Sequence, residues 1–357
     1  MNGRVQGVAT IEMSTDASIA RRRLRRNTSI WLRPALALLL AVTAGIGTSH
    51  AHAAGSDSRP VLAFYYTWYS PSTWCLCRMS DLPTIRYDSH AVTTIDRHIA
   101  WASDAGITGF ITSWWGPGSS SDHDFATLLS RSSLLEQTTN RRFSSTIYLE
   151  SDAPALTTES NIVAALRYVL ARYGADPHFL HWHGKPVIFI WDPLGGGRTL
   201  ATWADVRARV DPHDQTIWSA EGTDPALLGV FDGIHLFSAG YWGILAGNMA
   251  AVDQGFRAKV DAYNQAHGTR KIWAAGVQPG YDDRRVPGRQ NTYVVPRDGG
   301  ATYRTSWTAA MASNPDWITI STFNEWLEGG MIEPSIHYGG PYLTLTEHFI
   351  RQWRASA

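Results

Sequence analysis

The chain has 357 residues, 44% of them hydrophobic, which is enough for one large buried core. Lys and Arg together number 31 and so do Asp and Glu, so the formal net charge is zero. This balance excludes a global field that would attract nucleic acid, an anionic membrane surface or a strongly charged substrate, and we expect a neutral partner. The 16 Trp and 14 Tyr residues offer flat apolar faces that suit sugar rings, although core filling also accounts for most of them.

The N-terminus has the order of an export signal over residues 1–53. Consecutive arginines precede an apolar run at 34–47, and Ala51-His52-Ala53 has the small-x-small pattern of a cleavage site. We expect a polar linker at 54–60 and a secreted or extracytoplasmic mature chain. The apolar run is short for a bilayer, so a retained membrane anchor is the weaker alternative and stable membrane insertion is not expected. The arginines leave general secretion and twin-arginine export both open.

The two cysteines, Cys75 and Cys77, are separated by a single residue. A disulfide across so short a loop is strained and gains little from loop closure. A metal site would need further ligands that the neighbouring sequence does not provide. We interpret the pair as structural or incidental, with a small disulfide as the alternative.

Compact runs rich in β-branched and aromatic residues follow, and each is typical of a β-strand. There are eight: Val61–Trp68, Gly106–Trp115, Ser145–Glu150, Pro186–Trp191, Thr216–Glu221, Gly233–Ala239, Lys271–Val277 and Trp317–Glu325. Segments with helical periodicity lie between most of them, including Ala91–Ala105, Ile162–Tyr173, Trp203–Val210, Phe256–His267 and Tyr303–Ala312.

The alternation of strands and amphipathic helices defines the fold class. Such alternation indicates parallel βαβ units, and eight of them close into a barrel. We therefore predict one α/β domain over residues 61–357, a (β/α)8 or TIM barrel. An open doubly wound sheet is the alternative, but no glycine-rich nucleotide turn follows the first strand.

In such barrels the functional residues lie on the loops at the carboxyl ends of the strands, which we call the rim. Here these loops carry aromatic side chains and carboxylates together, the composition that a carbohydrate site requires. We predict that a sugar substrate contacts the following rim residues: Tyr66, Trp68, Trp114, Trp115, Glu150, Tyr281, Asp282, Asn324, Trp326 and Glu333.

Glu325 and Glu328, after the last strand, are the candidate catalytic pair. Cleavage of a glycosidic bond needs one carboxyl group that protonates the leaving oxygen and a second that supports the positive charge or activates an attacking group. On a continued strand these two would point to opposite faces, roughly 10 Å apart. If the chain turns helically at Trp326, their Cβ atoms come within about 5–6 Å. The following Gly329-Gly330 makes such a turn easy.

Closeness of the two glutamates has an electrostatic consequence. Two neighbouring carboxylates among apolar surfaces cannot both ionise freely, so one pKa should rise. A raised pKa is what a general acid near neutral pH needs, while its partner stays charged. The alternative is that Glu325 and Glu328 cap or salt-bridge a helix, but their position at the rim favours chemistry.

Other carboxylates at the rim carry less weight. Glu150 ends the third strand, where it could bind a sugar hydroxyl or form a structural ion pair, and the sequence does not separate the two. Asp282 and Asp283 follow Gly280, so either could simply shape a turn.

The histidines are interpreted as structural. His178, His181 and His183 have a spacing that suggests metal ligands, but they precede the fourth strand, at the end of the barrel opposite the rim. A polar loop is the better interpretation. His98 falls in a predicted helix, where a packed or surface histidine is more common than a catalyst.

Around these residues the sequence resembles glycoside hydrolase family 99, the endo-acting α-mannosidases and α-mannanases. The resemblance extends over nearly the whole mature chain. Its landmarks are Phe64-Tyr65-Tyr66-Thr67-Trp68-Tyr69, Tyr87-Asp88-Ser89, Ser113-Trp114-Trp115-Gly116, Gly184-Lys185-Pro186-Val187, Phe231-Asp232-Gly233, Pro279-Gly280-Tyr281-Asp282-Asp283, Thr322-Phe323-Asn324-Glu325-Trp326-Leu327-Glu328-Gly329 and Ile332-Glu333-Pro334.

The resemblance implies a retaining hydrolase that cuts internal α-1,2-mannosidic bonds in mannans or mannose-rich glycans without metal or organic cofactor. It implies that Glu325 acts on the sugar's own 2-hydroxyl to form a 1,2-anhydro sugar. Glu328 would protonate the departing oxygen and then activate water. Glu150, Tyr66 and the Trp114-Trp115 pair resemble substrate-binding residues of the family.

The sequence departs from the family pattern at positions that bear on substrate preference more than on reaction class. Leu327 stands where His is usual, and Gly330-Met331 where Thr-Gln is usual. Trp74-Cys75-Leu76-Cys77 replaces a His-Trp pair, and His235-Leu236-Phe237 lacks a common Tyr. An α-glucanase on a related barrel and a noncatalytic polysaccharide-binding or assembly protein therefore stay open as alternatives. We expect a monomer.

Overall fold

The computed structural model describes residues 59–245 and 247–356. The expected export signal at 1–53 and nearly all of the linker at 54–60 lie outside the described residues. Within the described part of the chain, no helix is both long enough and apolar enough to cross a membrane.

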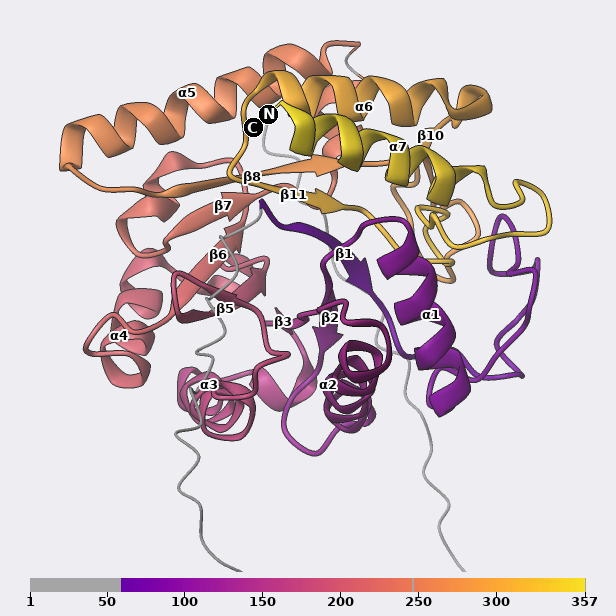
Figure 1. Cartoon of the computed structure of the whole chain (residues 1–357). Coiled ribbons are helices and arrows are strands. Elements are labelled where there is room, and N and C mark those ends of the chain that lie inside the picture. Colours follow the sequence, from indigo (N-terminus) through magenta and orange to yellow (C-terminus); the bar gives the residue numbers. More distant parts are fainter. Residues whose placement is uncertain (1–58, 246, 357) are drawn as a thin grey trace, which may run out of the picture. The chain divides into compact units, whose positions relative to one another are not determined.

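A closed barrel of eight parallel strands forms the centre of the fold (Figure 1). Its strands are β1 Val61–Tyr65, β2 Gly109–Trp114, β3 Thr146–Glu150, β5 Lys185–Trp191, β6 Ile217–Glu221, β7 Gly233–His235, β8 Ile272–Val277 and β11 Trp317–Ile320. They pair in the order β3-β2-β1-β11-β8-β7-β6-β5, and pairing of β5 with β3, with Phe189 opposite Tyr148, closes the ring. Each strand coincides with one of the eight predicted runs, β5 beginning one residue earlier, at Lys185, so the barrel prediction is confirmed.

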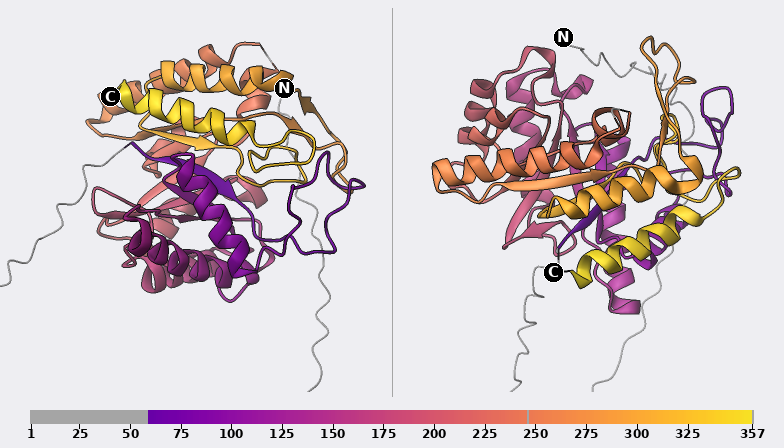
Figure 2. Two further views of the ribbon diagram at one scale, coloured as in Figure 1. Left: turned by 45° about the vertical axis from the view of Figure 1, so that its right-hand side comes forward. Right: turned by 90° about the horizontal axis from the view of Figure 1, so that it is seen from above.

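Helices cover the outside of the barrel, and three of them, α5, α6 and α7, lie along the upper edge of Figure 1 (see also Figure 2). They are α1 Val92–Asp104, α2 Ser120–Thr139, α3 Glu159–Tyr173, α4 Leu200–Val210, α5 Met249–His267, α6 Ala301–Ala312 and α7 Pro341–Ala355. The five predicted helical segments correspond to α1, α3, α4, α5 and α6. Helix α2 is capped at its N-terminus by Ser119, whose side chain accepts from the backbone of Asp122, and at its C-terminus by Asn140 in a left-handed conformation.

The core has two layers, as the continuous apolar strands require. One layer lies between the strands and the surrounding helices, and the other fills the inside of the barrel. Eight of the tryptophans in the described part of the chain are fully buried in these layers, which agrees with core filling: Trp114, Trp203, Trp218, Trp273, Trp307, Trp317, Trp326 and Trp353.

Long segments at the carboxyl ends of β1, β8 and β11 lie near one another on the right of Figure 1. The segment after β8 contains a short antiparallel pair, β9 Tyr281–Asp282 with β10 Val294–Val295. Another short strand, β4 His181–Trp182, pairs antiparallel with β5. Cys75 and Cys77, in the segment after β1, form a disulfide, which was the alternative left open by the sequence.

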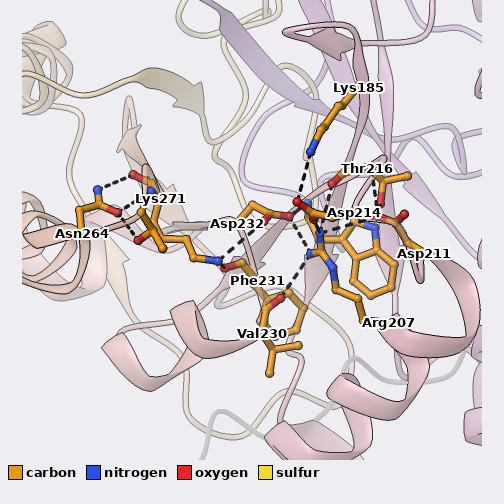
Figure 3. Close-up of polar contacts among 12 residues, drawn as sticks. Lys185, Arg207, Asp211, Asp214, Thr216, Val230, Phe231, Asp232, Asn264 and Lys271 are labelled. Atoms are coloured by element: carbon orange, nitrogen blue, oxygen red, sulfur yellow. Dashed lines mark hydrogen bonds and ion pairs between the residues drawn. The ribbon is translucent and has the colours of Figure 1, made fainter. Parts of the chain in front are cut away.

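A charged network ties together the loops at the opposite end of the barrel (Figure 3). Arg207 of α4 donates to Asp232 and to Asp214, both at 2.6 Å, and its guanidinium lies over the ring of Trp218 at 5.0 Å. Lys271 approaches Asp232 at 3.7 Å. Charges at this end of a barrel serve stability, because catalysis takes place at the other end.

One buried carboxylate in the helical layer predicts a pH dependence of stability. Asp253 of α5 has no exposed surface, and neither of its oxygens has a partner among the described residues. Burial raises its pKa from 3.8 to about 8. The folded protein therefore keeps a proton that the unfolded chain releases, and stability falls as pH rises from about 4 to about 8.

We expect Asp253→Asn to remove this loss. The gain in the free energy of unfolding should grow with pH and be of the order of 4 kcal/mol at pH 7. Thermal unfolding of both proteins between pH 5 and 8 measures it, with Glu347→Gln, an exposed carboxylate of α7, as control. Parallel pH curves for wild type and Asp253→Asn would contradict the burial argument.

Candidate active site

The candidate catalytic segment leaves β11 and forms a tight turn over residues 326–329. The Gly330 amide donates to the Glu325 carbonyl at 3.2 Å, and the Gly329 amide donates to the Trp326 carbonyl at 3.3 Å. Gly329 has φ of 62°, and a Cβ there would lie 2.8 Å from the Ser80 hydroxyl. A side chain would be strained at this position, which therefore suits glycine. The hydrogen bonds show that the turn predicted from the sequence is present.

A buried arginine holds the end of this turn in place. Arg297 is 7% exposed, and its guanidinium lies between the rings of Tyr338 and Tyr342, at 4.4 and 4.5 Å. It donates to the carbonyls of Gly329 at 2.8 Å and Met331 at 2.7 Å. Arg297 could not be recognised from the sequence, because its partners come from distant segments of the chain.

Glu325 is buried, with 3% of its surface exposed. Its Oε1 accepts from the Tyr69 hydroxyl at 3.2 Å and from the Leu327 amide at 3.0 Å. Its Oε2 has no hydrogen-bond partner among the described residues. Burial, and then the charge of Glu328, raises the pKa of Glu325 well above its usual value. Burial therefore favours the protonated form of Glu325 in the substrate-free site.

Glu328 is in a different environment because it forms an ion pair. Arg289 donates to its Oε1 at 2.7 Å, and the same guanidinium nitrogen contacts the Tyr281 hydroxyl at 2.8 Å and Asp283 at 3.1 Å. Arg289 could not be recognised from the sequence either, since the segment after β8 shows no periodic pattern that would place it.

The carboxyl with the raised pKa is not the one that was expected. A raised pKa was expected for the general acid, and the resemblance makes Glu328 that acid. The raised pKa belongs to Glu325 instead, because its carboxyl is buried beside the charge of Glu328.

Tyr66 lies among three carboxylates at the rim. Burial and the charges of Glu325, Glu150 and Glu328, in that order, raise the pKa of its hydroxyl. Glu150 accepts from the Ser113 hydroxyl at 2.6 Å, so its close partner is neutral and the structural ion pair is not the arrangement found. Burial raises the pKa of Glu150 to about 7, and the charge of Glu328 adds to the rise. The hydrogen bond from Ser113 acts in the opposite direction and lowers this pKa.

Two half-buried tryptophans lie beside this group. The ring of Trp68 lies 4.7 Å from that of Tyr66 and 6.2 Å from that of Trp115. The Trp115 indole donates to the Ser113 hydroxyl at 3.0 Å, next to Glu150. The structure therefore brings Tyr66, Trp68, Trp115 and Glu150 together near Glu325, as predicted for one rim.

Trp114 is not part of this group, and its predicted contact with substrate is corrected. Its side chain is fully buried in the layer between barrel and helices, where its indole donates to Asp122 at 3.0 Å and its ring faces Tyr168. Neighbouring residues on a strand point to opposite faces, so Trp114 points outward where Trp115 points to the rim.

Three further predicted contacts lie beneath the rim and are also corrected. Asn324 is fully buried and bonds both backbone groups of Tyr66, at 2.8 Å each. The buried Trp326 indole donates to Glu333 at 2.9 Å. Glu333 also accepts from Tyr87 and approaches His98 at 3.1 Å. The polar groups of these residues bond to other groups of the protein. We therefore assign them to positioning the candidate catalytic turn.

The carboxylates after β8 have structural partners as well. Asp282 pairs with Arg284 at 2.9 Å, and its amide donates to the Glu328 carbonyl at 2.8 Å. Asp283 accepts from the Tyr293 amide at 2.8 Å and lies beside Arg289. Both shape the segment that carries Arg289, as the alternative interpretation of a turn suggested.

A carboxylate that the sequence analysis passed over also lies at the rim. Glu221 ends β6, as Glu150 ends β3, and burial raises its pKa to about 8, with the charge of Asp192 adding to the rise. The position at the end of a barrel strand was the signal that could have identified it.

The histidines before β5 have protein partners. His178 pairs with Glu136 at 2.8 Å, and His181 contacts the carbonyls of Phe179 and Gly174 at 2.8 Å each. His98 is packed inside the protein between Tyr65 and Glu333, as interpreted. Among residues 59–245 and 247–356, no group of three His, Cys, Asp or Glu side chains is placed to hold a metal ion.

Comparison with known proteins adds a second line of evidence. The model of glycosyl hydrolase family 99 matches residues 80–343. A mouse glycoprotein endo-α-1,2-mannosidase-like protein is 24% identical over 295 residues, which cover 74% of this chain and 64% of that protein. The mouse glycoprotein endo-α-1,2-mannosidase is 23% identical over 266 residues, 70% of this chain and 55% of that one. The chain thus spans less than two thirds of these relatives.

The fold has close counterparts among solved structures. The GH99 endo-α-mannosidase from Bacteroides thetaiotaomicron, in complex with BIS-TRIS-propane, superposes with a TM-score of 0.70 at 22% identity. The match covers 84% of this chain and 99% of that one. At this identity the likeness concerns the fold alone.

Proposed function

Since this chain belongs to glycosyl hydrolase family 99, we propose that it hydrolyses internal α-mannosidic bonds, α-1,2-linked, in mannans or mannose-rich glycans, with retention of configuration. One observation carries the proposal. Glu325 and Glu328 lie three residues apart on a tight turn at the carboxyl end of β11, and burial, with the charge of Glu328, raises the pKa of Glu325. Two neighbouring carboxyls in different environments can supply both the acid and the base that glycoside cleavage needs.

The proposed reaction has two steps. In the first, Glu325 takes the proton from the 2-hydroxyl, whose oxygen attacks C1 while Glu328 gives its proton to the departing oxygen. The products are a 1,2-anhydro sugar and a shortened glycan. In the second, Glu328 takes a proton from water, the water oxygen attacks C1, and the 2-oxygen recovers its proton from Glu325. Each step returns the pair to a single proton.

The free Oε2 of Glu325 supports its role. This oxygen has no hydrogen-bond partner among the described residues, so a substrate hydroxyl can become its partner. A hydroxyl that donates there stabilises the ionised form of Glu325. Binding of substrate thereby favours the ionised Glu325 that the first step requires.

Arg289 sets the pH range of this pair, which gives a testable prediction. Its positive charge lowers the pKa of Glu325, against the rise caused by burial and Glu328, so its removal should raise that pKa further. We expect Arg289→Met to move the acid limb of the kcat/KM profile upward by about one pH unit or more. Arg289→Lys should keep the limb near its original position.

Profiles of kcat/KM against pH for the variants measure this shift. Arg285→Met is the matched control, because Arg285 lies on the same segment, is exposed and contacts backbone carbonyls. An unchanged acid limb in Arg289→Met would show that the ion pair does not govern the titration of the pair.

We propose that residues on the β1–β3 side bind the sugar whose C1 is attacked. Glu150 and Tyr66 offer groups for hydroxyls, and Trp68 and Trp115 offer apolar faces. The balanced charge of the chain agrees with a neutral glycan, and no cofactor has a step in this scheme. We propose that the protein acts as a monomer.

Product analysis tests the substrate class. Purified protein is incubated with α-mannans and α-glucans, and the released oligosaccharides are identified by mass spectrometry. Oligosaccharides from mannans alone are expected. Release from glucans instead would make the chain an α-glucanase, and binding without release would make it a noncatalytic polysaccharide-binding protein.

We also propose export of the protein through the segment 1–53. Mass spectrometry of material secreted by the producing cells should find a new N-terminus at Ala53 or Ala54, because the small-x-small pattern ends there. An intact N-terminus on protein confined to the cytoplasm would contradict export.

A further inference from the structure

Two aromatic side chains on the loop after β7 are exposed, unlike most others in the protein. Tyr241 and Trp242 lie on a short helical segment, Gly240–Ile244, and each is 45% exposed. Their rings meet edge to face at 5.2 Å. Exposed, adjoining aromatic faces at the catalytic end of a barrel are a common feature of ligand-binding surfaces.

These rings continue a row that begins at the candidate active site. Tyr241 lies 5.4 Å from Tyr293, and Tyr293 stacks on Tyr281 at 4.3 Å with an interplanar angle of 11°. The Tyr281 hydroxyl accepts from Arg289, which holds Glu328. The charge of Glu328 contributes, after burial, to a raised pKa of Tyr293, so this ring is within electrostatic reach of the site.

The outer end of the row borders a depression of about 350 Å³. Trp242 forms one wall of it, and Val252, Phe256 and Lys259 are among the residues opposite. Lys259 lies over the Phe256 ring at 4.8 Å and contacts the Thr223 carbonyl at 3.5 Å. The lining carries no carboxylate, so the surface suits an uncharged ligand with apolar faces and hydroxyl groups.

We infer that Tyr293, Tyr241 and Trp242, called the aromatic row, bind sugar units of the glycan on the leaving-group side of the cleaved bond. This inference rests on the proposed function and deepens it. The row starts beside Glu328, the group assigned to the leaving oxygen, whereas Glu150, Trp68 and Trp115 occupy the β1–β3 side. A neutral oligosaccharide that extends past Glu328 therefore meets three rings in succession.

Two substrates of different length test the row. One is an α-1,2-linked manno-oligosaccharide with several sugars beyond the cleaved bond, and the other carries an aryl leaving group and no sugars there. In the double variant Tyr241→Ala/Trp242→Ala, the ratio of kcat/KM for the long substrate to that for the aryl substrate should fall about tenfold or more. Leu245→Ala, which removes an exposed apolar side chain of the same loop, should leave the ratio unchanged.

An unchanged ratio in the double variant would overturn the inference. Failure of the proposed function is distinguishable, because the wild type would then cleave no glycan. Retardation of the proteins in gels that contain soluble α-mannan or α-glucan would decide the matter in that case. The wild type should be retarded more than the double variant, and equal retardation, with equal melting temperatures, would overturn the inference.

Discussion

Replacement of Glu328 by Gln should lower turnover of glycans with sugar leaving groups by about 10²–10⁴-fold. The amide keeps the shape of the side chain but has no proton to give to a poor leaving oxygen. An activated aryl leaving group needs little protonation, so its departure should suffer much less. Comparison of kcat/KM for a manno-oligosaccharide and an aryl glycoside measures the difference, because kcat/KM reports the reaction up to departure of the leaving group. The second step, in which Glu328 activates water for both substrates, enters kcat instead.

The variant Glu347→Gln, far from the rim on α7, serves as the control for the loss of a carboxylate. Near-normal activity of Glu328→Gln on both substrates would remove Glu328 from the chemistry. An equal loss on both substrates would contradict its role as the acid for the first step.

Replacement of Glu325 by Gln should impair both substrate types, by about 10²–10⁴-fold each. Assistance to the attacking 2-hydroxyl is needed whatever group leaves, and the amide cannot accept its proton. The wild type should in turn fail on a 2-deoxy substrate, because the internal nucleophile is missing. Kinetics with the two leaving groups and with the 2-deoxy sugar test both statements.

Two outcomes would change this assignment. A covalent sugar ester trapped on Glu325 would show that its carboxylate attacks the sugar directly. A loss in Glu325→Gln that depended on the leaving group would exchange the two roles, and the raised pKa of Glu325 would then be that of the acid.

The barrel could be predicted because the strands are buried on both faces. Continuous apolar runs such as β5 Lys185–Trp191 are visible in the sequence without knowledge of partners. Helix α2 was less visible, since its stretch Ser120–Thr139 is rich in Ser and Thr and is stabilised by a cap at Ser119. Helix periodicity alone does not reveal such a segment.

Whether a residue can contact substrate depends on which face of its strand its side chain occupies. The motif Trp114-Trp115 was assigned as a unit, but alternation along a strand separates its members, one toward Asp122 and one toward Ser113. The carboxylate of Glu333 was taken for a substrate contact, although it holds Trp326 from below. The sequence does not show which polar groups bond each other across long separations.

The arginines of the site were invisible for the same reason. Arg289 and Glu328 are 39 residues apart in the sequence. They meet because β9 pairs with β10, and the segment between these two strands, which contains Arg289, folds back over the turn. The sequence therefore predicted one raised pKa in the pair of carboxyls, but not that it belongs to Glu325.

The most direct test of the account is time-resolved proton NMR of a defined α-1,2-linked mannotetraose during hydrolysis by the wild-type protein. The account predicts cleavage at an internal bond and products that first appear as the α anomer. Release of mannose from one end only, first appearance of the β anomer, or an intact tetrasaccharide would contradict it.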